Sequence, residues 1–316
     1  MVKGNGTNYQ SKRNKNMNAR ALMKRLREES RGGVAAAEVE VSSAPPPPSD
    51  VSSSMDNSAV DNDNTTCTNA SSQDQLIERI IEIKCGSSRS TRRLNLLEDP
   101  TGSLAGGNGA TLWDSSLALT NFLTYHYADT DLSDKDVLEL GAGVGLVGMA
   151  LASMGANVVV TERDIALPLL RKNVDRNVKV TGGRVEVAEL SWSGDAMKNL
   201  MNTRKDLPFD IVVGSDLIFP SNSNAYVALA DAYEIILKQR SEMEDDTCNR
   251  DSGDCDIDIW LSHEPRIPAV EDEFFKAVKE RGIIVQRFDV DGVDEETKRL
   301  LPEDIFIYKL ALDLLV

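Results

Sequence analysis

The stretch Val137-Leu-Glu-Leu-Gly-Ala-Gly-Val-Gly-Leu-Val-Gly148 decides how this sequence folds. An apolar run, Val137 to Leu140, precedes closely spaced glycines, and an apolar helical pattern from Leu146 to Met154 follows them. Glycines let the backbone approach a ligand, and the first turn of a helix presents free N–H donors. The stretch therefore predicts a strand, a ligand-binding loop and a helix in succession.

Strand and helix patterns continue to alternate after this stretch, which is typical of a doubly wound, mainly parallel α/β sheet. No helical pattern separates the last two strands, so we expect them to pair antiparallel and to complete a Rossmann-like sheet of seven strands. The expected strands are Val158–Thr161, Val185–Val187, Asp210–Val213, Ile257–Leu261, Ile283–Phe288 and Ile305–Leu312, and the expected helices are Ala166–Val178, Asp195–Arg204, Ala225–Lys238 and Val270–Arg281.

The N-terminal side of the domain starts near Leu76. Ile80–Ile83 and Arg93–Leu96 flank a Gly-Ser turn and predict a β-hairpin. Apolar residues in Leu112–Tyr125 recur with the period of an amphipathic helix. We therefore expect a hairpin and a helix ahead of the glycine stretch.

The ends of the domain follow from composition. Residues 1–75, basic in 1–32 and rich in Ser, Asn and Pro in 33–75, lack the large apolar residues that would offset ordering entropy. We expect a disordered tail there and one α/β domain over 76–316. Acidic residues crowd 241–256, which we interpret as a surface insertion before the fifth strand.

Charge and cysteine usage exclude several protein classes. The chain has 51 Asp and Glu against 35 Lys and Arg, a net charge of −16 that argues against a general binder of nucleic acid or anionic membranes. Residues 1–32 carry +7, so only this tail has the charge to contact nucleic acid or to act as a nuclear address, and a solvated tail is the alternative. No run of about 18 apolar residues and no secretory signal occurs. The four cysteines and two histidines have neither disulfide nor zinc spacing, so we expect no metal and a cytoplasmic location, with the nucleus as a second one.

Two cofactors compete for the glycine loop. Gly143-Val-Gly145-Leu-Val-Gly148 also fits the dinucleotide pattern, although the strand already ends at Leu140, before Gly141. The acid Glu139, two residues before Gly141, instead suits the methionine ammonium of S-adenosyl-L-methionine (AdoMet). The position of this acid favours AdoMet over a nicotinamide cofactor.

Two later strand ends add candidate cofactor contacts. Glu162 ends the second strand of the expected sheet, where a carboxylate accepts the hydroxyls of a ribose from either cofactor. Leu190 and Trp192 follow the third strand and are candidate apolar walls for an adenine. For Trp192 the alternative is a core aromatic residue without a ligand.

Four segments follow one another along the chain: Gly109-Ala-Thr-Leu-Trp-Asp-Ser-Ser-Leu-Ala-Leu119, the glycine stretch, Leu190-Ser-Trp192 and Gly214-Ser-Asp-Leu-Ile-Phe219. In this order they resemble the motifs of the seven-β-strand protein methyltransferases of the methyltransferase-16 (methyltransferase-like 21) family. The resemblance spans roughly Ile80 to Leu312.

The resemblance implies AdoMet as methyl donor and a lysine side chain of a protein as acceptor, in a monomeric enzyme that touches no membrane. By the same resemblance the substrate is a chaperone, an ATPase or a translation factor. Together with the residues above it gives an AdoMet site of Trp113, Glu139, Gly141, Ala142, Gly143, Glu162, Leu190, Trp192 and Ser215.

The segment after the fourth strand carries the predicted catalytic residues. Asp216 matches the first position of the family's Asp-x-x-Tyr motif, and Phe219 stands where the family has Tyr. Asp216 would orient an amine, and Phe219 would offer its ring face to a methylated ammonium; a helix N-cap is the alternative role. Ser262-His-Glu-Pro-Arg266 and Phe274-Phe275 are similar to a later family stretch, in which His263 is either a base or a surface residue.

Other functions remain open at this point. One alternative is a methyltransferase whose acceptor is a small molecule, an arginine or a histidine. A non-catalytic interaction protein with this fold would explain Phe219 as lost chemistry. A nicotinamide dehydrogenase is the remaining reading of the glycine loop.

Overall fold

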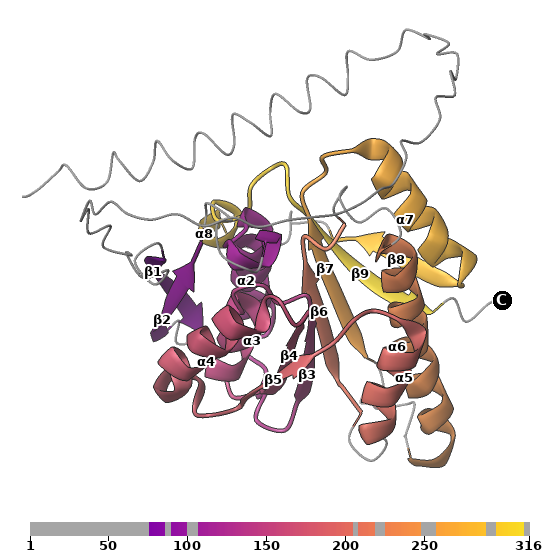
Figure 1. The fold of residues 1–316 in the computed structure, drawn as a ribbon, viewed down its shortest axis with the longest axis horizontal. Coiled ribbons are helices and arrows are strands. Elements are labelled where there is room, and N and C mark those ends of the chain that lie inside the picture. The colour runs from indigo at the N-terminus through magenta and orange to yellow at the C-terminus, as the bar shows by residue number, and fades with distance from the viewer. Residues whose placement is uncertain are drawn as a thin grey trace, which may run out of the picture. The chain divides into compact units, whose positions relative to one another are not determined.

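The structure is a computed structural model that describes residues 76–85, 90–99, 107–204, 208–218, 225–247, 257–288 and 295–312. Its main sheet consists of β3 (Asp136–Leu140), β4 (Asn157–Glu162), β5 (Val185–Glu189), β6 (Ile211–Ser215), β7 (Asp258–His263), β8 (Ile283–Arg287) and β9 (Phe306–Leu312). The strands lie in the order β5-β4-β3-β6-β7-β9-β8 (Figure 1), and β9 runs antiparallel to both of its neighbours. The other neighbouring pairs are parallel, which confirms the predicted fold class.

Helices cover both faces of the sheet (Figure 1). One face carries α2 (Asp114–His126), α3 (Leu146–Ser153) and α4 (Leu167–Thr181), and the other carries α5 (Gly194–Thr203), α6 (Ala225–Thr247) and α7 (Pro268–Glu280). A 3-10 helix at Gly107–Ala110 and α8 (Glu295–Lys298) complete the described helices.

The alternation of side chains along the strands produces two cores. In β3, Val137 joins the core under α2, α3 and α4, and Leu138 joins the core under α5, α6 and α7. Successive side chains of a strand point to opposite faces, so a strand that is covered on both sides must be apolar at nearly every position. Glu139 is the exception among the buried positions of β3, because its carboxylate is buried on the α3 side.

The predicted hairpin is confirmed as β1 (Ile77–Cys85) and β2 (Ser90–Glu98), an antiparallel pair. Two side chains of α4 hold its second strand. Asn173 accepts from the Leu97 N–H at 2.7 Å, and Asn177 accepts from the Asn95 N–H at 2.8 Å. The hairpin is thus fastened to the helix that follows β4.

Some predicted bounds differ from the structure. The helix predicted to end at Lys238 continues to Thr247, and the stretch predicted as a loop between the last two strands contains α8. The first residues of the predicted acidic insertion are therefore helical. Its remainder, 248–256, and the predicted tail, 1–75, lie outside the described residues.

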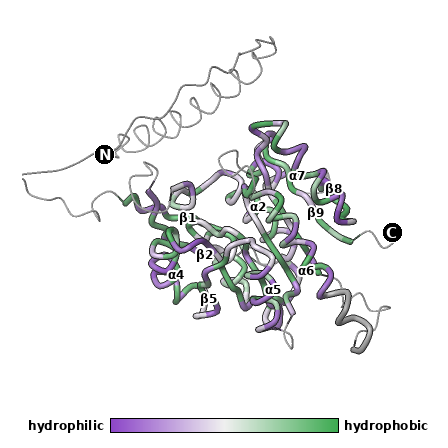
Figure 2. Tube along the Cα trace, turned by 45° about the vertical axis from the view of Figure 1, so that its right-hand side comes forward, coloured by the Kyte–Doolittle hydropathy of each residue, from purple (hydrophilic) through white to green (hydrophobic). Residues whose placement is uncertain are grey.

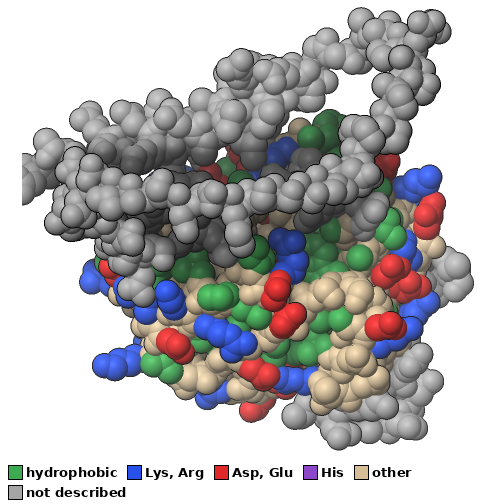
Figure 3. Space-filling model, viewed as in Figure 1, with side chains coloured by type: hydrophobic (Ala, Val, Ile, Leu, Met, Phe, Trp, Pro, Cys, Tyr) green, Lys and Arg blue, Asp and Glu red, His purple; other side chains and the backbone are tan. Residues whose placement is uncertain are grey.

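Apolar and polar residues are distributed as in a sheet covered by helices. Hydrophobic and hydrophilic residues alternate along α4 and α7 (Figure 2), so each helix turns an apolar stripe to the sheet. On the face shown in Figure 3, acidic and basic side chains are interspersed rather than segregated. Within the described ranges, no helix has the length and apolar character needed to cross a membrane.

Candidate active site

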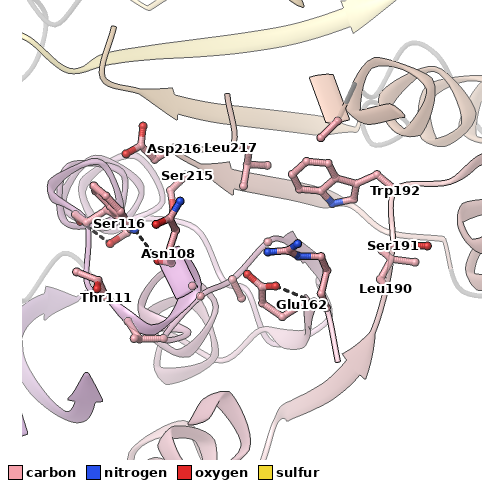
Figure 4. Close-up of a pocket in the computed structure, with 18 of the residues that line it drawn as sticks. Asn108, Thr111, Ser116, Glu162, Leu190, Ser191, Trp192, Ser215, Asp216 and Leu217 are labelled. Carbon is pink, nitrogen blue, oxygen red and sulfur yellow. Dashed lines mark hydrogen bonds between the residues drawn. The ribbon is translucent and has the colours of Figure 1, made fainter. Parts of the chain in front are cut away.

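A cavity of about 390 Å³ lies at the carboxyl ends of β3, β4, β5 and β6, within the size range of small-molecule sites. This is the edge of an open parallel sheet where ligands gather. In Figure 4, Ser215 and Asp216 lie across the site from Leu190 and Trp192, with Glu162 between the two groups. The predicted residues that line the cavity are Trp113, Gly141, Ala142, Gly143, Glu162, Leu190, Trp192, Ser215 and Asp216.

The glycine loop closes one side of the cavity with backbone alone. Gly141 has φ +59°, and a Cβ there would lie 2.6 Å from Cδ2 of Leu217. Gly143 has φ +56°, and a Cβ there would lie 3.2 Å from the carbonyl oxygen of Gly109. Between them the Ala142 N–H donates to the Thr161 carbonyl at 2.8 Å, which ties the loop to the neighbouring strand. Any side chain at Gly141 would therefore strain the loop and force the Leu217 side chain to shift.

Glu139 lies behind this loop and does not line the cavity. Its side chain is 1% exposed, and Oε2 accepts from the Gly148 N–H in α3 at 2.8 Å. Burial raises the pKa of Glu139 to about 8. Glu139 thus supports the helix that follows the loop, and its predicted role beside a methionine ammonium stays a prediction.

Glu162 brings a carboxylate to the middle of the cavity. The Arg163 N–H donates to its Oε2 at 2.7 Å, and its Oε1 is the atom that a Cβ on Gly109 would meet at 3.1 Å. Burial raises the pKa of Glu162, while the Arg163 N–H, the Arg163 charge and the Gly143 N–H oppose that rise. The carboxylate is a strong acceptor for hydroxyl groups in this position.

Leu190 and Trp192 form the apolar end of the cavity. Leu190 is buried, whereas Trp192 is half-buried and packs on the core under α5 and α6. Cζ2 of Trp192 lies 3.3 Å from the place of a Cβ on Gly141, so the indole reaches over the glycine loop. Trp192 is therefore both a core residue and a wall of the cavity, the two roles considered for it from the sequence.

Trp113 begins α2 and is held on two sides. Its Nε1 donates to the Asn108 carbonyl at 2.9 Å, and its own carbonyl accepts from the Ser116 hydroxyl at 2.7 Å. The guanidinium of Arg266 lies 5.2 Å from the ring centroid, within range of a cation–π contact. The indole is therefore fixed between the cavity and the loop after β7.

Asp216 follows β6 with an unusual backbone and buried partners. Its φ is +57°, and its N–H donates to the Ser262 carbonyl at 2.8 Å. Arg266 donates to both carboxylate oxygens, and His263 lies 3.5 Å from Oδ1. Burial would raise the pKa of Asp216, but His263 and Arg266 outweigh it and lower that pKa below its ordinary value.

His263 lies between two carboxylates. Its Nδ1 faces Asp216, and its Nε2 is 3.3 Å from Oε1 of Glu271 in α7. Burial would lower the pKa of His263, but the two carboxylates outweigh it and raise that pKa above its ordinary value. The side chain is 1% exposed, so the predicted alternative of a surface residue is wrong.

Residues 90–251 match a protein family described as lysine methyltransferase. The chain belongs to this lysine methyltransferase family. The resemblance found in its sequence is thereby confirmed. Among the described residues of the chain, no group of three or more His, Cys, Asp or Glu side chains is placed to hold a metal ion.

Several curated relatives are similar to this chain over about a third of its length. Protein N-lysine methyltransferase METTL21A of Danio rerio is 36% identical over 36% of this chain and 49% of its own length. METTL21A of Xenopus tropicalis is 34% identical over 42% of this chain and 60% of its own length. EEF1A lysine methyltransferase 3 of Mus musculus is 35% identical over 36% of this chain and 45% of its own length. The chain thus spans about half the length of the curated relatives it matches.

The predicted site and the site in the structure do not contain all the same residues. The predicted residue Phe219 lies outside the described residues. Arg266 and Glu271 had no predicted role, yet they hold Asp216 and His263. For Arg266 the available signal was the polar stretch Ser262–Arg266, which begins at the carboxyl end of β7, beside the strand that precedes Asp216.

Proposed function

We propose that this chain is an AdoMet-dependent methyltransferase that modifies lysine side chains of a protein. The observation that carries the proposal is a single cavity that joins the glycine loop, Glu162, Trp192 and Asp216. In a member of the lysine methyltransferase family, such a cavity offers a donor site and an acceptor carboxylate side by side.

The residues of the cavity fit AdoMet part by part. The backbone of Gly141 and Gly143 leaves room for the methionine portion, Glu162 can accept both ribose hydroxyls, and Leu190 with Trp192 can enclose the adenine. When bound, AdoMet supplies a sulfonium-borne methyl group that an amine lone pair can attack in line. The chain's part in such a displacement is mainly to align the nucleophile, and alignment can supply much of the rate.

Asp216 is suited to orient the acceptor rather than to take its proton. A lysine ammonium has no lone pair and must lose a proton before it reacts. Because the pKa of Asp216 is lowered, its carboxylate stays ionised and is a poor base at neutral pH. It can accept a hydrogen bond from the amine and stabilise the cation that transfer produces.

The protein substrate is inferred from relatives rather than from the cavity. The mouse relative's name gives EEF1A as its substrate, so purified EEF1A is a defined first probe.

A cytoplasmic location is part of the same proposal. Fluorescence microscopy of the tagged full chain, with and without residues 1–32, would test it.

Transfer of label from tritium-methyl AdoMet to EEF1A and to a methyltransferase-depleted lysate tests the proposed function. We expect a discrete labelled protein band that yields methyl-lysine after hydrolysis. Asp216→Ala should weaken labelling by about 10²-fold or more, whereas Asp272→Ala, an exposed acid of α7, should not.

Four results would contradict the proposal. Methylarginine or methylhistidine in the band would change the acceptor. Label only in the small-molecule fraction would indicate a metabolite as acceptor. AdoMet binding without any labelled product would favour a non-catalytic protein, and NADH binding by fluorescence titration would favour a dehydrogenase.

A further inference from the structure

Asp216 is fixed by charged side chains that come from the loop after β7. Nη1 of Arg266 donates to Oδ1 at 2.6 Å, and Nη2 donates to Oδ2. The side chains of Asp216 and Arg266 are 3% and 6% exposed. A two-point contact between guanidinium and carboxylate sets the orientation of the carboxylate as well as its position.

The contact between Arg266 and Asp216 lies at the cavity, where the orientation of the carboxylate matters. Asp216 lines the cavity, and its left-handed backbone is anchored to β7 through the Ser262 carbonyl. Buried ion pairs are often no better for stability than apolar side chains of similar volume. The indole of Trp113, which is held by its own bond to the Asn108 carbonyl, lies 5.2 Å from the same guanidinium.

The cluster around Asp216 retains negative charge. Its carboxylates are Asp216, Glu264 and Glu271, its permanent cation is Arg266, and His263 adds a second cation when it is protonated. Three anions against at most two cations leave at least one net negative charge beside the cavity. Within the described part of the chain, Oδ2 of Asp216 receives one contact, from Arg266, so a lone pair remains for another donor.

We propose that Arg266 and His263 are positioning residues that hold the Asp216 carboxylate, ionised and oriented, as the hydrogen-bond acceptor for the lysine amine. This inference rests on the proposed function. The amine enters neutral, having lost one proton to water. Its nitrogen forms the bond to the methyl carbon, the bond from that carbon to sulfur breaks with its electron pair going to sulfur, and the nitrogen becomes a methylammonium. Asp216 gains no proton in this step and pairs with the new cation.

A double-mutant cycle separates positioning from mere structural support. The variants are Asp216→Asn, Arg266→Gln and the double variant, with labelling rate and AdoMet affinity measured for each. Arg281→Gln is the matched control, because Arg281 also donates to an aspartate, Asp231, at 2.6 Å. Arg266→Lys keeps the charge but loses the two-point contact, and it serves if Arg266→Gln does not fold.

We expect Arg266→Gln to slow labelling at least about 10-fold while AdoMet affinity changes by less than about 3-fold. The double variant should be no slower than Asp216→Asn, because Arg266 acts through Asp216. Arg266→Lys should slow labelling less than Arg266→Gln, and Arg281→Gln should label like wild type. Wild-type labelling by Arg266→Gln, or a double variant slowed by the product of the two single effects, would overturn the proposal.

Failure of the proposed function can be distinguished from failure of the positioning role. If wild type labels no protein, the function is wrong and the positioning role falls with it. If wild type labels a protein and Arg266→Gln labels it equally, only the positioning role is wrong.

NMR titration of the imidazoles gives a second readout that needs no substrate. The chain has two histidines, so His126→Gln assigns both signals. Asp216 and Glu271 face His263 from the loop after β6 and from α7, and we expect Asp216→Asn to lower the pKa of His263. An identical titration in wild type and Asp216→Asn would overturn the assigned contact.

Discussion

The side-chain amide of Asn173 donates to the carbonyl oxygen of Val144 at 3.0 Å, which joins α4 to the glycine loop. The same nitrogen donates to the Leu97 carbonyl at 3.0 Å, and Oδ1 accepts from the Leu97 N–H at 2.7 Å. Asn173 is fully buried, so water cannot replace these bonds. One amide therefore couples the N-terminal hairpin to the loop that lines the cavity.

Asn173→Asp should weaken both the fold and AdoMet binding. The new oxygen would face two carbonyl oxygens where an N–H₂ group now donates, at a cost of about 2–4 kcal/mol in the free energy of unfolding. Asn177→Asp is the control, since Asn177 makes the same paired bonds to Asn95 of β2 but none to the loop. Urea unfolding and calorimetry with AdoMet would measure the two effects. Equal loss of AdoMet affinity in both variants would contradict the proposed coupling.

Gly141→Ala should abolish or strongly weaken AdoMet binding. Alanine at φ +59° costs about 1–2 kcal/mol, and its Cβ would lie 2.6 Å from Cδ2 of Leu217 on the cavity wall. Gly182→Ala has the same backbone cost at φ +64°, but its Cβ would meet nothing closer than 4.0 Å. Calorimetry should show lost affinity only for Gly141→Ala. Micromolar binding by that variant would remove the glycine loop from the AdoMet site.

The alternation of strands and helices and the glycine loop could be predicted because local patterns encode them. Val137–Leu140 has the pattern of a strand that is buried on both faces, and the closely spaced glycines after it indicate a tight turn against a ligand. These features depend on neighbours in sequence. The cavity residues Glu162, Trp192 and Asp216 were predictable for a related reason, since each follows a strand whose carboxyl end meets the same edge.

The contacts that orient those residues could not be predicted in the same way. Arg266 and Asp216 are fifty positions apart, and their pairing depends on β6 and β7 being neighbours in register. The place of β9 between β7 and β8 likewise depends on pairing choices that no local period encodes. In the sequence, Asn173 is an ordinary polar residue of a helix, and its role depends on the packing of the hairpin against α4.

Glu162→Gln should reduce AdoMet affinity by about 10- to 100-fold, because hydrogen bonds to a charged acceptor contribute about 1.5–3 kcal/mol. Glu162 is well placed for this test, since it lines the cavity and its Oε2 already accepts the Arg163 N–H. Glu189 lies opposite Glu162 in β5 and is exposed, so Glu189→Gln is a matched control. Calorimetry should show unchanged affinity for the control. If both variants bind AdoMet like wild type, Glu162 does not hold the ribose.

Glu139→Gln should change how stability depends on pH. The pKa of Glu139 is about 8 in the folded protein against an ordinary 4.5, so between these values the folded state holds a proton that the unfolded state has lost. The free energy of unfolding then falls as pH rises, by about 1.4 kcal/mol per pH unit from this one group. Glutamine keeps an acceptor for the Gly148 N–H but cannot ionise. The variant should therefore gain stability relative to wild type from pH 5 to pH 8.

The difference between the two proteins isolates Glu139 from the other buried groups. The pKa of His263 is raised from 6.5, so its contribution is present at low pH and is lost as pH rises through the raised value, in wild type and variant alike. The pKa of Asp216 is lowered from 3.8, so its contribution is lost only at lower pH, outside this range. Urea unfolding at fixed ionic strength from pH 5 to pH 8 measures the difference. Parallel curves for the two proteins would mean that Glu139 is ionised in the fold, and the Gly148 N–H would then be pairing with a buried carboxylate.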